Sequence, residues 1–155
     1  MDSLGAVLAI ATLASLTGVE LCVAAFFHPT LERLDDAARV VARARSAVVL
    51  GRVMPLWYIA ALIAAGLATG QAIVSGGMLP AALWVVCTVG LIAVIVVTVV
   101  VLVPLNTTLA ASGPGGPGGE AESHRRTAAR WDALHRGRTL ALGVVLLVEV
   151  TATRL

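Results

Sequence analysis

Four polar side chains that are suited to acid–base chemistry stand at the ends of long apolar segments, namely His28, Asn106, His135 and Arg138. An imidazole can take a proton from a substrate, and an amide or a guanidinium can stabilise the oxyanion that results. In a bundle of antiparallel helices, the end of one helix lies level with the start of the next. The sequence therefore predicts a catalytic site made of these four residues at one end of such a bundle.

The last apolar segment carries a periodic pattern that extends this site. Its marked residues follow one another at intervals of three or four: Trp131, His135, Arg138, Leu142, Val145 and Glu149. This spacing places side chains on one face of a helix. We expect that face to point inwards, with Trp131 available to bind substrate.

Two carboxylates are predicted to lie deep between the helices. Glu20 is about 12 Å from His28 along the helix axis, and Glu149 is about 16 Å from Arg138. An ionisable group inside a membrane is by default a functional candidate. We expect Glu20 and Glu149 to pair by sharing a proton, because two ionised carboxylates repel each other. Both are predicted to contribute to substrate binding together with Phe27.

Composition indicates where such helices reside. The chain has 155 residues, of which 59% are hydrophobic and 13% charged, whereas soluble domains are about 45–50% apolar and about 25% charged. The fold class that follows is all-α, an integral membrane antiparallel four-helix bundle with short amphipathic cytoplasmic extensions. A net charge of +2 is too small to indicate nucleic acid binding. Cys22 and Cys87 lie in apolar runs and are expected to be buried hydrophobes.

The chain is predicted to be a single transmembrane domain, residues 1–155, because about 20 apolar residues cross a bilayer. The expected spans are residues 4–27, 47–69, 79–103 and 139–153. Pro29 should close the first span and Pro104 the third, and Pro55 should lie in the first turns of the second. The fourth span is short and is expected to continue a helix that starts near Glu120. Further expectations are an amphipathic surface helix or helix extension over 31–46, a loop over 70–78 and a flexible Gly/Pro linker over 112–119.

The arginines predict the orientation. Eight of the eleven basic residues fall in the first and third connections, and the second connection has none. Because cytoplasmic loops carry the excess of basic residues, we expect the first and third connections in the cytoplasm and both termini outside. The expected location is a bacterial plasma membrane.

These motifs resemble a known family. The order Phe27-His28-Pro29, Met54-Pro55, Pro104-x-Asn106 and Trp131-x3-His135-x2-Arg138 is similar to that of the anthrone oxygenase-like family, also called domain of unknown function 1772. The resemblance spans nearly the whole chain. It implies a small four-helix membrane protein and, for the fungal polyketide-pathway members, oxygenation of an anthrone to an anthraquinone. By this resemblance the site residues are His28, Asn106, Trp131, His135 and Arg138.

The leading functional hypothesis is a membrane oxidoreductase that acts on a hydrophobic aromatic, anthrone- or quinol-like molecule at the cytoplasmic interface. His135 or His28 would be the base, and no cofactor is strictly required. One alternative is that His28 and His135 hold a haem or a metal ion. Another is a non-enzymatic accessory or carrier subunit that uses Glu20 and Glu149. Expected partners are the lipid bilayer and a hydrophobic small molecule, and a homo-oligomer is left open.

Overall fold

The computed structural model describes residues 4–75, 77–111 and 118–155, and of residues 118–121 only the backbone. The described chain is helical apart from short connections. In chain order its elements are α1 (Leu4–Cys22), the π-helix η1 (Val23–Phe27), α2 (His28–Leu31), α3 (Asp36–Ser75), α4 (Met78–Val97), the π-helix η2 (Thr98–Leu102), α5 (Val103–Ala110) and α6 (Gly118–Ala152).

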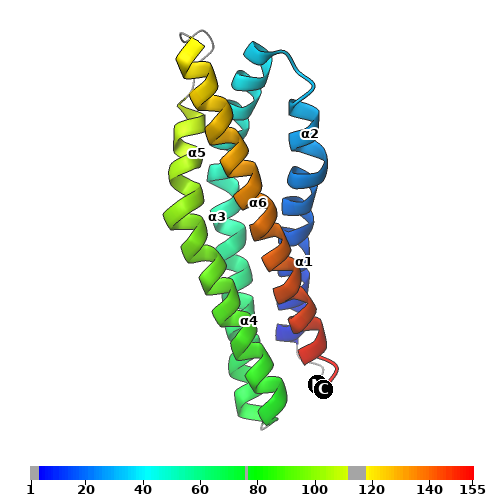
Figure 1. Ribbon diagram of the computed structural model, residues 1–155. Coiled ribbons are helices and arrows are strands. Elements are labelled where there is room, and N and C mark those ends of the chain that lie inside the picture. Colours follow the sequence, from blue (N-terminus) through cyan, green and yellow to red (C-terminus); the bar gives the residue numbers. More distant parts are fainter. Residues whose placement is uncertain (1–3, 76, 112–117) are drawn as a thin grey trace.

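These elements combine into four long helical rods. The first joins α1, η1 and α2, the second is α3, the third joins α4, η2 and α5, and the fourth is α6. Figure 1 shows the rods running along the molecule in alternating directions, so that the start of α1 and the end of α6 lie at the same end of the molecule. The first and fourth rods contact each other. The first rod also packs on the second, and the fourth rod packs on the third.

Three of the rods are long and apolar enough to cross a membrane: Leu4–Leu31, Asp36–Ser75 and Met78–Ala110. Most of the apolar stretch in each of these rods is not covered by protein, because only 17–28% of it is buried inside the molecule. Outward-facing Val, Leu and Ile side chains of this kind are suited to lipid. The fourth rod, α6, is not among the three. Its apolar part is the short segment 139–153, which includes Glu149, and charged residues crowd its first half.

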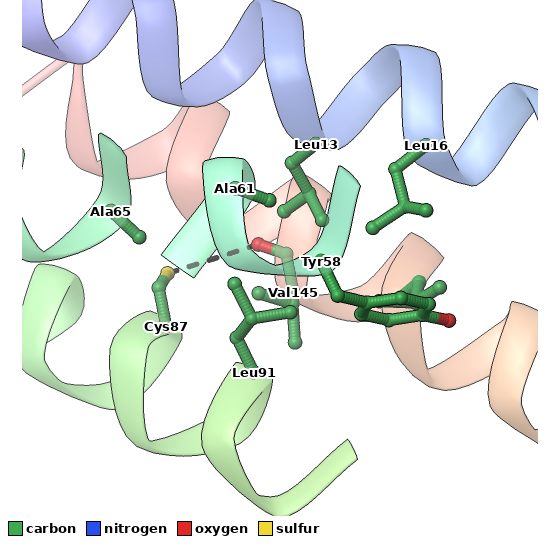
Figure 2. Packing of buried hydrophobic residues seen from close by; sticks show 9 residues of the cluster. Leu13, Leu16, Tyr58, Ala61, Ala65, Cys87, Leu91 and Val145 are labelled. Atoms are coloured by element: carbon green, nitrogen blue, oxygen red, sulfur yellow. Dashed lines mark hydrogen bonds between the residues drawn. The ribbon is translucent and has the colours of Figure 1, made fainter. Parts of the chain in front are cut away.

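Small side chains allow the rods to approach closely. Eight of the buried core residues on α1 and α3 are alanines, including Ala9, Ala65 and Ala72, each fully buried. Such residues let helix backbones come close together, which is how helices associate in lipid. In the central cluster, the Cys87 thiol lies 3.8 Å from the carbonyl oxygen of Val145 (Figure 2). Cys22, in contrast, is exposed, which differs from the burial expected for it.

Neither Pro29 nor Pro104 ends its helix, so the prediction that these prolines close the first and third helical segments was wrong. Each rod continues past its proline, to Leu31 and to Ala110. Proline lacks an N–H group, and its ring clashes with the carbonyl four residues earlier. In both rods a five-residue π-helix ends two residues before the proline. The wider π turn accommodates the proline and keeps the rod continuous.

The second rod begins far earlier than its predicted span. The Asp35 side chain accepts a 2.9 Å hydrogen bond from the backbone N–H of Ala38, which caps the helix that starts at Asp36. The expected amphipathic segment is thus the start of a 40-residue helix. Pro55 consequently lies well inside α3, and its prediction as a residue of the first turns was wrong.

The remaining connections differ in length from their predictions. The loop expected over 70–78 is mostly helical, because α3 runs to Ser75 and α4 starts at Met78. The linker expected over 112–119 falls largely on residues 112–117, which lie outside the described residues. Its last two residues, Gly118 and Gly119, already belong to α6. This agrees with the prediction of a helix that starts near Glu120.

Candidate functional site

A buried cluster of polar side chains forms where α1, α3 and α6 meet, and Glu20 is at its centre. One Glu20 carboxylate oxygen, Oε2, lies 2.7 Å from Arg138 Nη2 and 3.0 Å from His135 Nδ1. The other, Oε1, accepts a 2.8 Å hydrogen bond from the hydroxyl of Tyr58. Glu20 and His135 are each 1% exposed. A carboxylate at this depth requires such partners, because an ion buried without a counter-charge is strongly unfavourable.

The ring of His135 contacts both the first rod and Arg138. Its Nε2 lies 3.1 Å from the backbone carbonyl oxygen of Glu20. Its Nδ1 lies 3.0 Å from Glu20 Oε2 and 3.0 Å from Arg138 Nη2. Both ring nitrogens of His135 are therefore engaged within the protein. His135 is arranged to hold Arg138 and the first rod in place, and a proton transfer to a substrate would break one of these contacts.

A second polar cluster, centred on Asp132, lies next to the first. Arg43 forms a two-pronged ion pair with the Asp132 carboxylate, at 2.9 and 2.7 Å, and also reaches Glu32 at 2.7 Å. His28 Nδ1 lies 3.2 Å from Asp132 Oδ1. A carboxylate beside Nδ1 favours the proton on that nitrogen and leaves Nε2 as the basic atom. Among the described residues, no hydrogen-bond partner is found for His28 Nε2.

An aromatic stack joins the two clusters. The Trp131 and His135 rings lie parallel, at 11° with 4.8 Å between their centroids. The His28 ring stands edge-on to Trp131 at 5.0 Å and is 5.3 Å from His135. Phe27 is next to His28, with their centroids 6.0 Å apart. Packing on several sides limits the motion of His28, so its orientation is well defined.

His28, Trp131 and Asn106 line one small pocket, together with Phe27 and Leu31. About 20 Å³ is open to the centre of a water molecule, which is room for about one water. Asn106 donates a 3.0 Å hydrogen bond from Nδ2 to the backbone carbonyl of Ala47, which leaves its second N–H available. The Trp131 indole N–H is buried and has no hydrogen-bond partner.

The structure thus brings together most of the predicted site residues, in two levels. His28, Asn106, Trp131 and Phe27 surround the pocket, whereas His135 and Arg138 lie deeper around Glu20 and are not among the pocket's lining residues. The residues of the α6 stripe are buried or half-buried, which confirms that this face points inwards.

Glu149 does not join the site, and the predicted pairing of Glu20 with Glu149 was wrong. Glu20 pairs with Arg138, and Glu149 lies eleven residues further along α6, a distance of about 16 Å. Glu149 is 1% exposed, and its Oε2 has no hydrogen-bond partner. The two carboxylates are equally buried but differ in their partners: Glu20 is contacted by several donors, whereas no hydrogen bond or ion pair to the Glu149 carboxylate is found among the described residues.

Tyr58, Asp132 and Arg43 were missed as site residues by the sequence analysis. Tyr58 is at the edge of the apolar core, with its hydroxyl pointing away from Ala65 (Figure 2). Asp132 directly follows Trp131 in the sequence. The only signal that could have indicated Asp132 and Arg43 was that they carry opposite charges. That signal did not distinguish Arg43 from its neighbouring arginines, because the register between α3 and α6 cannot be obtained from either helix alone.

A wider, charged hollow of about 310 Å³ lies on the other side of Asp132, and His124 and Arg39 help to line it. Neither ring nitrogen of His124 has a partner. Burial, and then the positive charges of Arg43 and Arg39, lower the pKa of His124 below its ordinary value.

No group of three or more His, Cys, Asp or Glu side chains suited to holding a metal ion occurs in the described ranges. His28 and His135, the two ligands considered for a haem or a metal, have three of their four ring nitrogens in contact with protein groups. Ligation by His135 would require it to give up Glu20 or Arg138.

Comparison with known proteins identifies the family of the chain. The model of the anthrone oxygenase family matches residues 46–148, about two thirds of the chain. The matched range includes Tyr58, Asn106 and the α6 residues from Trp131 to Arg138, and it leaves out Glu20 and His28. No curated protein and no solved structure matches the chain. With the match over most of its length, the chain belongs to the anthrone oxygenase family.

Proposed function

We propose that this protein is a membrane-embedded oxygenase that removes a proton from an acidic C–H bond of a hydrophobic aromatic molecule and so allows molecular oxygen to react there. The observation that carries the proposal is the His28–Asp132 pair at the small pocket: Nδ1 faces a carboxylate at 3.2 Å, and Nε2 is left for a substrate. Membership of the anthrone oxygenase family supports the same reaction class.

His28 is the base in this proposal, and Asp132 orients it. A general base has to reach the substrate proton directly, and His28 lines the pocket whereas His135 does not. Arg43 holds the Asp132 carboxylate through two hydrogen bonds, so that Asp132 cannot rotate away from the imidazole. This is the arrangement in which a carboxylate selects the tautomer of a catalytic histidine.

The oxyanion that forms when the proton leaves needs hydrogen-bond donors. Two donors are available at the pocket: the second N–H of Asn106 and the unpartnered indole N–H of Trp131. Donors fixed in advance stabilise developing charge without reorganisation, and removal of one typically lowers kcat by about 10²–10³. Arg138, which the sequence suggested as a donor to the oxyanion, forms an ion pair with Glu20 instead and acts on the site through its contact with His135.

The reaction balances with oxygen as the sole oxidant. His28 Nε2 takes one proton from the methylene carbon of an anthrone-like substrate and leaves an enolate. Oxygen adds at that carbon, and the peroxide anion recovers the proton from His28. Loss of the second C–H proton then breaks the O–O bond and releases water. In sum, a methylene group and O₂ yield a ketone and water.

The finer architecture that we propose is one domain that inserts as an antiparallel four-helix membrane bundle. The three apolar rods support insertion, and the alternating chain direction in Figure 1 supports the bundle. The arginine distribution would place the site end in the cytoplasm and both termini outside. The fourth rod crosses with the help of its partners, because Glu20 neutralises Arg138 within the bundle.

Oxygen uptake with an anthrone substrate tests this function. The three histidines provide a matched set of variants, His28→Gln, His135→Gln and His124→Gln. We expect His28→Gln to lower kcat by about 10²–10⁴, the usual contribution of a general base, and His124→Gln to retain it. Rates for His28→Gln equal to those of the wild type, or no uptake above the spontaneous rate for the wild type, would refute the proposal.

A further inference from the structure

An open groove runs beside the pocket, between α2 and the first turns of α3. Its volume is about 670 Å³, within the roughly 300–1,000 Å³ of typical small-molecule sites. Its walls are formed by apolar side chains such as Leu34, Ala38 and Val41. Figure 1 shows α2 and the start of α3 standing apart at the end of the molecule that is remote from the start of α1 and the end of α6.

The groove leads to the catalytic pocket. Phe27, Leu31 and Ser46 line both hollows, so these three side chains form the partition between them. The pocket has room for about one water, whereas the groove can hold a molecule of several rings. A molecule of several rings therefore fits the groove and not the pocket.

Arg45 gives the groove a chemical preference. It is the one charged residue among those lining the groove, and it is exposed. Its neighbours Arg39 and Arg43 are both paired with carboxylates, whereas none of the salt bridges between described residues involves Arg45. An apolar trough with one unpaired cation at its wall suits an apolar body that carries one acidic oxygen.

We propose that this groove is the entry and resting site for the substrate, and that it selects a planar apolar molecule with an ionisable hydroxyl group, which Arg45 binds. The inference rests on the proposed function for the fate of the ligand, but binding in the groove is a separate property. The occupant is the small-molecule substrate and not a bilayer lipid.

Thiol protection tests occupancy without any turnover. In a Cys22→Ser background, Ala38→Cys places a thiol in the groove, and Ala129→Cys places one on exposed α6 outside the groove as the control. Cys87 is buried and will not react. The full-length protein in lipid vesicles is labelled with a fluorescent maleimide, with and without a dihydroxyanthraquinone as the hydroxylated probe and anthracene as the probe without oxygen.

At a probe concentration ten times its Kd, about a tenth of the sites are free, so labelling of the Ala38→Cys variant should slow about tenfold, while labelling of the control is unchanged. Adding Arg45→Gln should weaken protection by the hydroxylated probe, by up to about fivefold in Kd for an exposed charge, and should leave protection by anthracene unaffected.

If the hydroxylated probe protects the Arg45→Gln variant as well as it protects the parent protein, the role of Arg45 is overturned. If neither probe slows the labelling of Ala38→Cys, the groove is filled by lipid or is empty, and the proposal is overturned. Protection in a protein that proves inactive in oxygen uptake would refute the proposed function and support the groove.

Discussion

Glu20 and Glu149 provide a test of what stabilises the bundle, because they are equally buried and differ in their partners. Glu20 is contacted by Arg138, Tyr58 and His135 at 2.7–3.0 Å. Glu20→Gln keeps the shape and removes the negative charge, which leaves the guanidinium of Arg138, with a side chain 11% exposed, without its counter-ion. Loss of one member of a buried ion pair costs about 3–5 kcal/mol. We therefore expect Glu20→Gln to lower the free energy of unfolding by that amount.

The matched variant is Glu149→Gln. In apolar surroundings without a counter-charge, a carboxyl group is held as the neutral acid, so that its replacement by a neutral amide of similar shape should cost less than about 1.5 kcal/mol. The assay is reversible unfolding of both variants in mixed micelles with increasing denaturing detergent, followed by the circular dichroism of the helices.

A double-mutant cycle gives the result that could refute this reasoning. If Glu20 and Arg138 interact as described, combining Glu20→Gln with Arg138→Gln should cost less than the sum of the single changes, by about 0.5–3 kcal/mol. Additive effects would show that the two side chains do not pair in the folded protein. Equal destabilisation by Glu20→Gln and Glu149→Gln would show that burial alone, and not the partners, determines the cost.

Three further outcomes follow from the structure. Asp132→Asn should lower kcat by at least about tenfold with little change in KM, because it affects the orientation of His28 and not the binding of the substrate; steady-state oxygen uptake checks it, and an effect confined to KM would contradict it. Maleimide should spare Cys87, which is buried, until the protein unfolds; mass spectrometry of the labelled protein shows which thiol has reacted, and labelling of Cys87 in the folded protein would contradict its burial. The lowered pKa of His124 predicts that stability falls as the pH drops below about 6.5, because the unfolded chain then takes up a proton that the folded chain does not. His124→Gln should make this loss of stability on acidification smaller. A pH profile of stability that is unchanged by His124→Gln would contradict the burial of His124.

Much of the helical layout could be predicted from the sequence, because long apolar runs leave few alternatives. Three of the four predicted spans fall within helices that are apolar enough to cross a membrane. The inward face of α6 could be predicted too, since intervals of three and four residues identify one side of a helix. The ends of the first and third rods could not, because a proline predicts a break, and only the structure shows the π turns that accommodate Pro29 and Pro104.

The candidate site was predicted in its residue types more than in its pairings. His28, His135 and Arg138 were selected because each is polar at the end of an apolar run. Their partners depend on how far one helix slides along another, which no single helix encodes. Glu20 was accordingly assigned to Glu149, although the registers of α1 and α6 place it against Arg138. The choice between two histidines as base likewise required the contacts of each ring nitrogen.

The central claim, that His28 removes a carbon-bound proton, can be measured without oxygen. An anthrone incubated with the protein in heavy water under anaerobic conditions exchanges its methylene hydrogens for deuterium at the rate of proton removal, which mass spectrometry follows. We predict exchange well above the spontaneous rate with the wild type and with His124→Gln, and exchange at the spontaneous rate with His28→Gln. Exchange by His28→Gln as fast as that by the wild type would contradict the assignment of His28 as the base.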